Sequence, residues 1–176
     1  MASQVVRNFM KQQGFAEEPP ATCDMHFTGL YFQPRIVFPL VLVGIILNAA
    51  GMIVTSAVLF LALSTVLWWN VSFPALNPFE RFYNAAIAIP RCKTILPPAP
   101  APRRFAQGMA AAFMLIDGLC LLQGWQVTAW IFEAGLFAAF SALVFGKFCL
   151  GAYIYHLLRG EFDFANDTLP WARPSN

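Results

Sequence analysis

Two long uncharged stretches dominate the pattern of hydrophobic and polar positions along this chain. The first runs from Ile36 to Trp69, and about 34 residues in one helix would extend for ~50 Å, which exceeds the ~30 Å hydrocarbon core of a bilayer. The chain therefore has to reverse within this stretch. The expected turn is the Asn-Ala-Ala-Gly segment 48–51, because Asn and Gly tolerate the backbone angles of a tight reversal. The pattern predicts a first helix over roughly 31–48 and a second over roughly 52–70.

The second uncharged stretch predicts another pair of helices. It opens after Arg104, is interrupted by the polar segment Gln-Gly-Trp-Gln at 123–126, and continues to about Phe145. Residues 105–158 are thus expected to hold a second transmembrane hairpin together with an interfacial extension. That extension, from about Lys147 onward, would bend onto the membrane surface.

The remaining segments are predicted to lack long regular structure. The middle segment 71–104 is rich in proline, which disfavours helices and strands. Within it, residues 77–88 are expected to form a short interfacial helix whose apolar side chains share one side, with Glu80 and Arg81 elsewhere. Residues 1–30 form an N-terminal segment, and 159–176 are expected to form an extended tail that can dock on a partner.

Composition agrees with a membrane protein. Hydrophobic residues make up 59% of the chain and charged residues 11%, whereas a soluble domain carries about 25% charged residues. The net charge of +2 is too small to indicate a nucleic-acid partner. The fold class expected is therefore an all-α membrane protein, a bundle of four transmembrane helices made of two helical hairpins.

The positions of the positive charges predict the orientation of these helices. Both predicted turns lack charge, whereas the middle segment holds one acid, Glu80, and these basic residues: Arg81, Arg91, Lys93, Arg103 and Arg104. Cytoplasmic loops collect Lys and Arg, and short translocated loops do not. Four spans would put the middle segment and both termini in the cytoplasm. Among the basic residues, Arg91, Lys93, Arg103 and Arg104 are candidates for contact with lipid headgroups.

Two carboxylates stand well inside the apolar helices of the second hairpin. Asp117 and Glu133 each lie about eight residues from the centre of the turn, so they are expected at similar depth and can face each other. Such a pair is a candidate for proton or cation translocation, because intramembrane acids are costly to keep without a role and two close carboxylates share a proton. The alternative is that the carboxyls are protonated and join helices by hydrogen bonds, or reach interfacial water.

Four short motifs resemble those of one known family. They are Asn-Pro-Phe at 77–79, Arg-Phe-Tyr at 81–83, Pro-Arg-Arg-Phe-Ala-Gln at 102–107 and Gly-Lys-Phe-Cys-Leu-Gly at 146–151. Together they resemble the bacterial membrane family catalogued as domain of unknown function 4395, over about residues 31–158. The resemblance implies a location in the bacterial inner membrane. In that family the last motif commonly ends Cys-x-Gly-Cys, but Ala152 stands here where the second Cys would be, so exchange between two thiols within this motif is excluded.

The other cysteines and the histidines indicate no cofactor. Cys23, Cys92, Cys120 and Cys149 include no Cys-x-x-Cys pair, so neither a disulfide framework nor a zinc site is expected. His26 and His156 lie outside the apolar centres where axial haem ligands would be expected. The sequence therefore predicts no metal and no cofactor.

Three functions remain open after these observations. The leading one is a non-catalytic accessory or structural subunit that assembles with a larger membrane complex or with itself, in contact with membrane lipids. One alternative is a thiol-redox component in which Cys149 acts with a soluble thioredoxin-like partner. The other is proton or cation translocation through Asp117 and Glu133. No nucleophile with an adjacent base is visible, so the sequence favours a protein that is not an enzyme.

Overall fold

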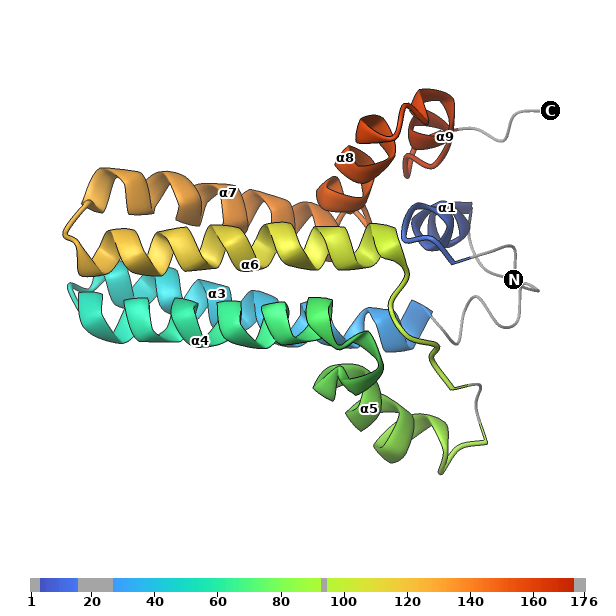
Figure 1. Cartoon of the computed structure of the whole chain (residues 1–176), viewed down its shortest axis with the longest axis horizontal. Helices are drawn as coiled ribbons and strands as arrows, with labels where there is room; N and C mark the ends of the chain where they lie inside the picture. The colour runs from blue at the N-terminus through green and yellow to red at the C-terminus, as the bar shows by residue number, and fades with distance from the viewer. Residues whose placement is uncertain (1–3, 16–26, 93–94, 173–176) are drawn as a thin grey trace.

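The computed structural model describes residues 4–15, 27–92 and 95–172, and within these ranges the chain is helical and forms no strand. Four helices are long and apolar enough to cross a membrane. They are α3 (Phe32–Ala49), α4 (Ile53–Ser72), α6 (Ala101–Leu122) and α7 (Gln126–Val144), which lie side by side in one bundle (Figure 1). This confirms the prediction of an all-α membrane protein with four spans.

The long helices are joined in pairs by two short turns at one end of the bundle, which we call the turn end (Figure 1). Gly51 and Gly124 occupy these turns with φ of 78° and 74°. A side chain would strain the backbone at such angles, so glycine is the residue that permits the reversal. The first turn falls between the end of α3 at Ala49 and the start of α4 at Ile53, close to its predicted position.

Packing within the bundle is closest between α4 and α6. A Cβ atom at Gly118 would come within 2.7 Å of Leu61 Cγ and 3.1 Å of the Ala57 carbonyl oxygen, so only glycine allows this approach. Nearby, Ser64 Oγ donates to the Ala111 carbonyl oxygen at 2.7 Å. Small residues and interhelical hydrogen bonds of this kind hold helices together where lipid removes the hydrophobic drive to associate.

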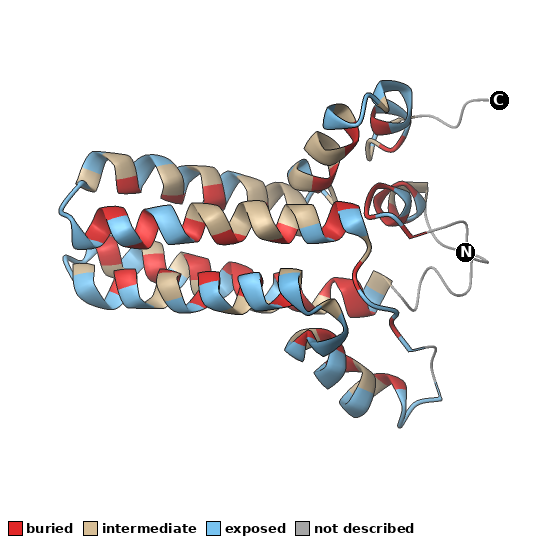
Figure 2. Cartoon of the chain, in the orientation of Figure 1, coloured by how far each residue is buried: buried red, intermediate tan, exposed pale blue. Residues whose placement is uncertain are grey.

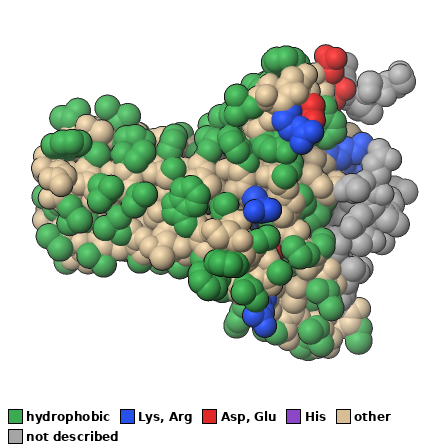
Figure 3. Space-filling view, viewed as in Figure 1, with side chains coloured by type: hydrophobic (Ala, Val, Ile, Leu, Met, Phe, Trp, Pro, Cys, Tyr) green, Lys and Arg blue, Asp and Glu red, His purple; other side chains and the backbone are tan. Residues whose placement is uncertain are grey.

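The opposite end, which we call the terminal end, carries the shorter helices (Figure 1). These are α1 (Gln4–Gln12), α5 (Pro78–Tyr83), α8 (Leu150–Leu158) and α9 (Phe162–Asp167). A 3₁₀ turn at Pro74–Leu76 precedes α5 and a π-helical turn at Asn84–Ala88 follows it. Figure 2 shows buried and exposed residues alternating along the long helices, and Figure 3 shows Lys and Arg side chains gathered toward the terminal end on the visible face.

Outside the spans, the structure shifts one boundary, corrects one expectation and adds one helix. Helix α6 begins at Ala101, slightly before the hairpin boundary expected at 105, because Pro102 in the first turn suits a helix start, where its missing N–H is not needed. The tail predicted to be extended contains α9. Helix α1 also forms, with Phe9 and Met10 buried in a cluster that includes Tyr31, so its stability depends on contacts with distant parts of the chain.

Candidate functional site

Helix α6 brings buried polar residues into both ends of the bundle along one side. Arg103 and Gln107 lie at its terminal end, and Asp117 lies about 15 Å beyond Gln107 along the helix axis. All three are buried, although polar and charged side chains are seldom placed inside an apolar bundle without partners. Each end of α6 therefore organises one polar cluster.

The cluster at the turn end joins three helices. Glu133 Oε1 accepts a hydrogen bond from Asn48 Nδ2 at 3.0 Å, and Asn48 Oδ1 accepts one from Gln126 Nε2 at 2.7 Å. Asp117 interacts electrostatically with Glu133, and both are at most 1% exposed. The structure thus places the two predicted acids together, and it adds two amides whose role sequence reasoning missed because they stand beside the turns.

Several other oxygens of this cluster lack hydrogen-bond donors. Among the described residues, both carboxylate oxygens of Asp117, Oε2 of Glu133 and Oε1 of Gln126 are buried without a hydrogen-bond partner. Two ionised carboxylates without a counter-charge in an apolar interior would be prohibitively costly. The pair is therefore expected to retain at least one proton, which would supply a missing donor.

An apolar layer separates the turn-end cluster from the terminal end. Val41, Phe60, Met114 and Leu136 come from the four long helices, and each is at most 1% exposed. The buried hydroxyls that flank Phe60 on α4, those of Ser56 and Ser64, each donate to a backbone carbonyl of a neighbouring helix. The geometry favours interhelical hydrogen bonding over passage of a cation through the monomer.

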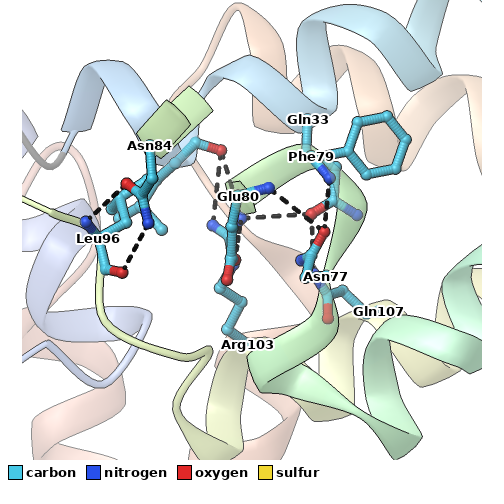
Figure 4. Close-up of polar contacts among 9 residues, drawn as sticks. Gln33, Asn77, Phe79, Glu80, Asn84, Leu96, Arg103 and Gln107 are labelled. Carbon is cyan, nitrogen blue, oxygen red and sulfur yellow. Dashed lines mark hydrogen bonds and ion pairs between the residues drawn. The ribbon is translucent and has the colours of Figure 1, made fainter. Parts of the chain in front are cut away.

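The cluster at the terminal end is built around an ion pair (Figure 4). Arg103 Nη2 lies 3.2 Å from Glu80 Oε1, with about 6–7% of either side chain exposed. Gln33 Oε1 accepts hydrogen bonds from Arg103 Nη2 at 3.3 Å and from Gln107 Nε2 at 2.9 Å. Burial raises the pKa of Glu80, and the neighbouring Arg103 opposes that rise. Helices α3, α5 and α6 are thereby joined by one buried network.

Local structure around α5 explains how Glu80 reaches this network. Asn77 Oδ1 accepts from the backbone N–H groups of Phe79 and Glu80, which caps the first turn of α5. The cap directs Glu80 inward and leaves Phe82 exposed. Glu80 is therefore buried, and its carboxylate pairs with an arginine 23 positions later in the chain, a contact that the pattern of the short helix did not predict.

The candidate headgroup contacts fall into different environments. Arg103 is buried and paired, so the structure corrects its assignment to lipid headgroups. Arg91 and Arg104 are exposed, and Arg104 Nε also donates to the Val71 carbonyl oxygen at 3.1 Å. Lys93 lies outside the described residues.

A cavity of about 100 Å³ adjoins the terminal-end cluster, and Cys149 lines it. Cys149 precedes the first turn of α8, and its backbone N–H donates to Gln12 Oε1 at 3.0 Å. Burial raises the pKa of the Cys149 thiol, while the backbone N–H of Ala152, the Gln13 side chain and Arg103 act in the opposite direction. The thiol is thus protonated at neutral pH and lines a partly open cavity.

No second thiol lies near Cys149 among the described residues. Ala152 is fully buried at the position of the family's second Cys, Cys92 is exposed in the middle segment, and Cys120 is buried in the turn-end half of α6. Cys23 falls outside the described residues. Within the ranges that the structure covers, no group of three His, Cys, Asp or Glu residues is placed to hold a metal ion.

His156 contacts other parts of the fold through both of its ring nitrogens. Its Nδ1 lies 2.6 Å from Glu161 Oε2 and its Nε2 lies 3.1 Å from the Gln12 carbonyl oxygen. The hydrogen bond to His156 is the main cause of the lowered pKa of Glu161. Both ring nitrogens are therefore engaged in holding α8 to α1 and to the start of α9.

These features define a class of protein: a small multi-pass membrane protein with four apolar spans and a buried polar cluster at each end of the bundle. Residues 31–159 match the model of the family described as Domain of unknown function (DUF4395), and the chain belongs to this family. No curated protein and no solved structure matches the chain.

Proposed function

We propose that this protein is a non-catalytic accessory subunit of the bacterial inner membrane that binds a larger membrane complex, or a second copy of itself, through its terminal end. The observation that carries the proposal is that α1, α8 and α9 are held to one another by hydrogen bonds between distant parts of the chain. Loose tails would not have such contacts. Helices α1, α8 and α9 form an ordered surface at the terminal end, which we call the platform.

Three contacts hold the platform together. Asn8 Nδ2 donates to the Leu169 carbonyl oxygen at 2.8 Å, Gln12 Oε1 accepts from the Cys149 backbone N–H, and the Gln12 carbonyl oxygen lies 3.1 Å from His156 Nε2. Large apolar side chains remain exposed on it, including Leu158 at 73% and Trp171 at 71%. Exposed apolar groups on an ordered surface are typical of a protein-binding site.

Charge placement supports a cytoplasmic platform. The exposed residues Arg81, Arg91, Arg104 and Arg159 belong to segments of the terminal end, and the positive-inside rule puts such segments in the cytoplasm. Next to Arg81, the exposed Phe82 would enter the lipid interface while the arginine stays among the headgroups. Contact with anionic lipid is therefore part of the proposal.

The proposal is tested by native mass determination after purification of the tagged full chain in a mild detergent. We expect a defined complex whose cross-links map to the platform, and its loss in the double variant Leu158→Gln with Phe162→Gln. The matched control is Trp125→Gln, which alters an equally exposed apolar residue at the turn end. A monomer free of stoichiometric partners, or a complex that survives the platform variant and fails in the control, would contradict the proposal.

One observation favours a second candidate, a thiol function of Cys149. The thiol lies at the start of α8 and lines a cavity shared with Arg103, so a small reactant inside the cavity would meet it. Cys149→Ser would then abolish activity with a soluble thiol partner, whereas Cys120→Ser, a buried cysteine in the other half of the bundle, would not. Equal behaviour of the two variants would argue against thiol chemistry.

A further inference from the structure

We infer that the cavity at the terminal end is a binding site for one small neutral amphipathic molecule, with a carbonyl or hydroxyl oxygen at its head and an apolar body. The inference does not depend on the accessory role, because it rests on the cavity between the long helices and the α1 and α8 segments rather than on the exposed surface of the platform. It also requires no chemistry at Cys149.

The walls of the cavity suit an apolar body. Most of the lining side chains are apolar and come from helices α1, α3, α4, α6 and α7: Phe9, Val37, Leu67, Ala110, Phe140 and Leu143. Small residues create the space, because Ala106 and Ala139 line the cavity from facing helices. The volume of about 100 Å³ is several times the ~10–15 Å³ that one water needs on the same measure. Walls that are mostly apolar favour a guest with an apolar body.

Three buried polar atoms belong to residues that line the cavity and lack hydrogen-bond partners. Among the described residues they are Nε2 of Gln13, Nε of Arg103 and Oε1 of Gln107, and each residue is more than nine-tenths buried. Figure 4 shows Arg103 and Gln107 in the network around Gln33. Buried polar atoms in native proteins are almost always paired, so these three point to a bound group. Two are donors and one is an acceptor, which fits a head that accepts and, when it is a hydroxyl, also donates.

The charge balance of the site favours a ligand whose head group is uncharged. Arg103 already pairs with the buried Glu80 at 3.2 Å, so the cluster has no excess positive charge. A carboxylate head would add a negative charge beside Glu80 in an apolar setting, and that charge would have no counter-ion. A carbonyl or hydroxyl head accepts from Arg103 without this cost.

The site is tested with the full chain in lipid nanodiscs, using a variant in which Cys23, Cys92 and Cys120 are replaced by Ser so that Cys149 is the sole thiol. The probes are 1-decanol, 2-decanone and decanoate, which share a chain length and differ in the head. The first readout is the rate at which methyl methanethiosulfonate modifies Cys149. The second is the midpoint of thermal unfolding.

We expect 1-decanol or 2-decanone to slow modification of Cys149 about tenfold and to raise the unfolding midpoint, as binding to the native state requires. Comparison of these two probes separates a hydroxyl head from a carbonyl head. Decanoate is expected to do neither at the same concentration.

A matched pair of variants separates binding in the cavity from a general effect of the probes on the bilayer. Ala139→Leu fills the cavity, whereas Ala138→Leu adds the same atoms to the exposed side of the same helix. The probe effects should disappear in Ala139→Leu and persist in Ala138→Leu. Gln107→Leu, which removes the unpaired acceptor, provides a second variant if Ala139→Leu does not fold.

Three outcomes would overturn the inference. The first is the absence of protection and of stabilisation by both neutral probes, as expected if water alone fills the cavity. The second is an equal response of the Ala138 and Ala139 variants. The third is stronger binding of decanoate than of 1-decanol and 2-decanone.

Discussion

The buried charged residues near the two ends of α6 are neutralised in different ways. At the terminal end, Arg103 meets Glu80 at 3.2 Å, and the unpaired atoms left over include both a donor and an acceptor. At the turn end, Glu133 accepts a hydrogen bond from an amide, and among the described residues the unpaired atoms of the cluster are all acceptors. The first cluster is balanced by a counter-charge and the second has to be balanced by a proton. The comparison teaches that the same apolar interior imposes neutrality on both clusters by different means.

The largest expected effect on stability comes from removing the positive charge that pairs with Glu80. Arg103→Met leaves Glu80 buried without its partner, and removing one member of a buried ion pair costs about 3–5 kcal/mol of stability. The cost should be measured as the change in unfolding free energy of the purified protein in detergent. The double variant Arg103→Met with Glu80→Leu should recover most of the loss. A double variant as unstable as the single one would show that the pair is not what Arg103 provides.

A smaller loss of stability is expected when the amide that donates to Glu133 is removed from the turn-end cluster. Asn48→Leu removes the hydrogen bond of 3.0 Å to Glu133 Oε1 and leaves a buried acceptor unsatisfied, which costs about 1–3 kcal/mol. The same unfolding measurement applies. Ala50→Leu, an exposed position near the same turn, is the control. A loss as large as that of Arg103→Met would mean that Glu133 is charged rather than protonated, and the contrast between the two ends would fail.

Because the carboxyls at the turn end are expected to hold a proton, the protein should tolerate replacement of Asp117 by a neutral residue of the same shape. Asp117→Asn keeps the shape of a protonated carboxyl and removes only its titration, so the unfolding free energy should change by less than about 1 kcal/mol. Glu80→Gln at the terminal end, by contrast, should destabilise the protein because it leaves Arg103 without a counter-charge. Similar losses in the two variants would erase the distinction between the clusters.

The spans could be predicted from the sequence because their signal is local. Length and apolar character set four helices, and the turn positions followed from Asn and Gly. The interaction of Asp117 with Glu133 is also consistent with the sequence, where each acid lies about eight residues from the turn. These properties involve neighbours in sequence, which is why the pattern of hydrophobic positions contains them.

The pairing of Glu80 with Arg103 and the cavity depend on contacts between distant segments. The pair requires α5 to fold back against α6, and the cavity requires α1 and α8 to cover one end of the bundle. Helix α1 is stabilised by burial of Phe9 against Tyr31, which no local pattern indicates. The terminal end was therefore the part that sequence reasoning described least well, and it contains the site inferred here.

The smallest expected effect concerns the reactivity of the Cys149 thiol, which can be measured in the folded protein. Because burial raises the pKa of the Cys149 thiol, less thiolate exists at neutral pH than in free cysteine, whose pKa is about 8.5. Alkylation of Cys149 in the single-thiol protein should therefore be slower than that of the denatured chain, and its rate should rise at higher pH than for free cysteine. Arg103 acts to lower this pKa, so Arg103→Met with Glu80→Leu should move the pH profile further upward. A profile at or below that of free cysteine would show that Arg103 and the start of α8 outweigh burial, and would make Cys149 a reactive thiol.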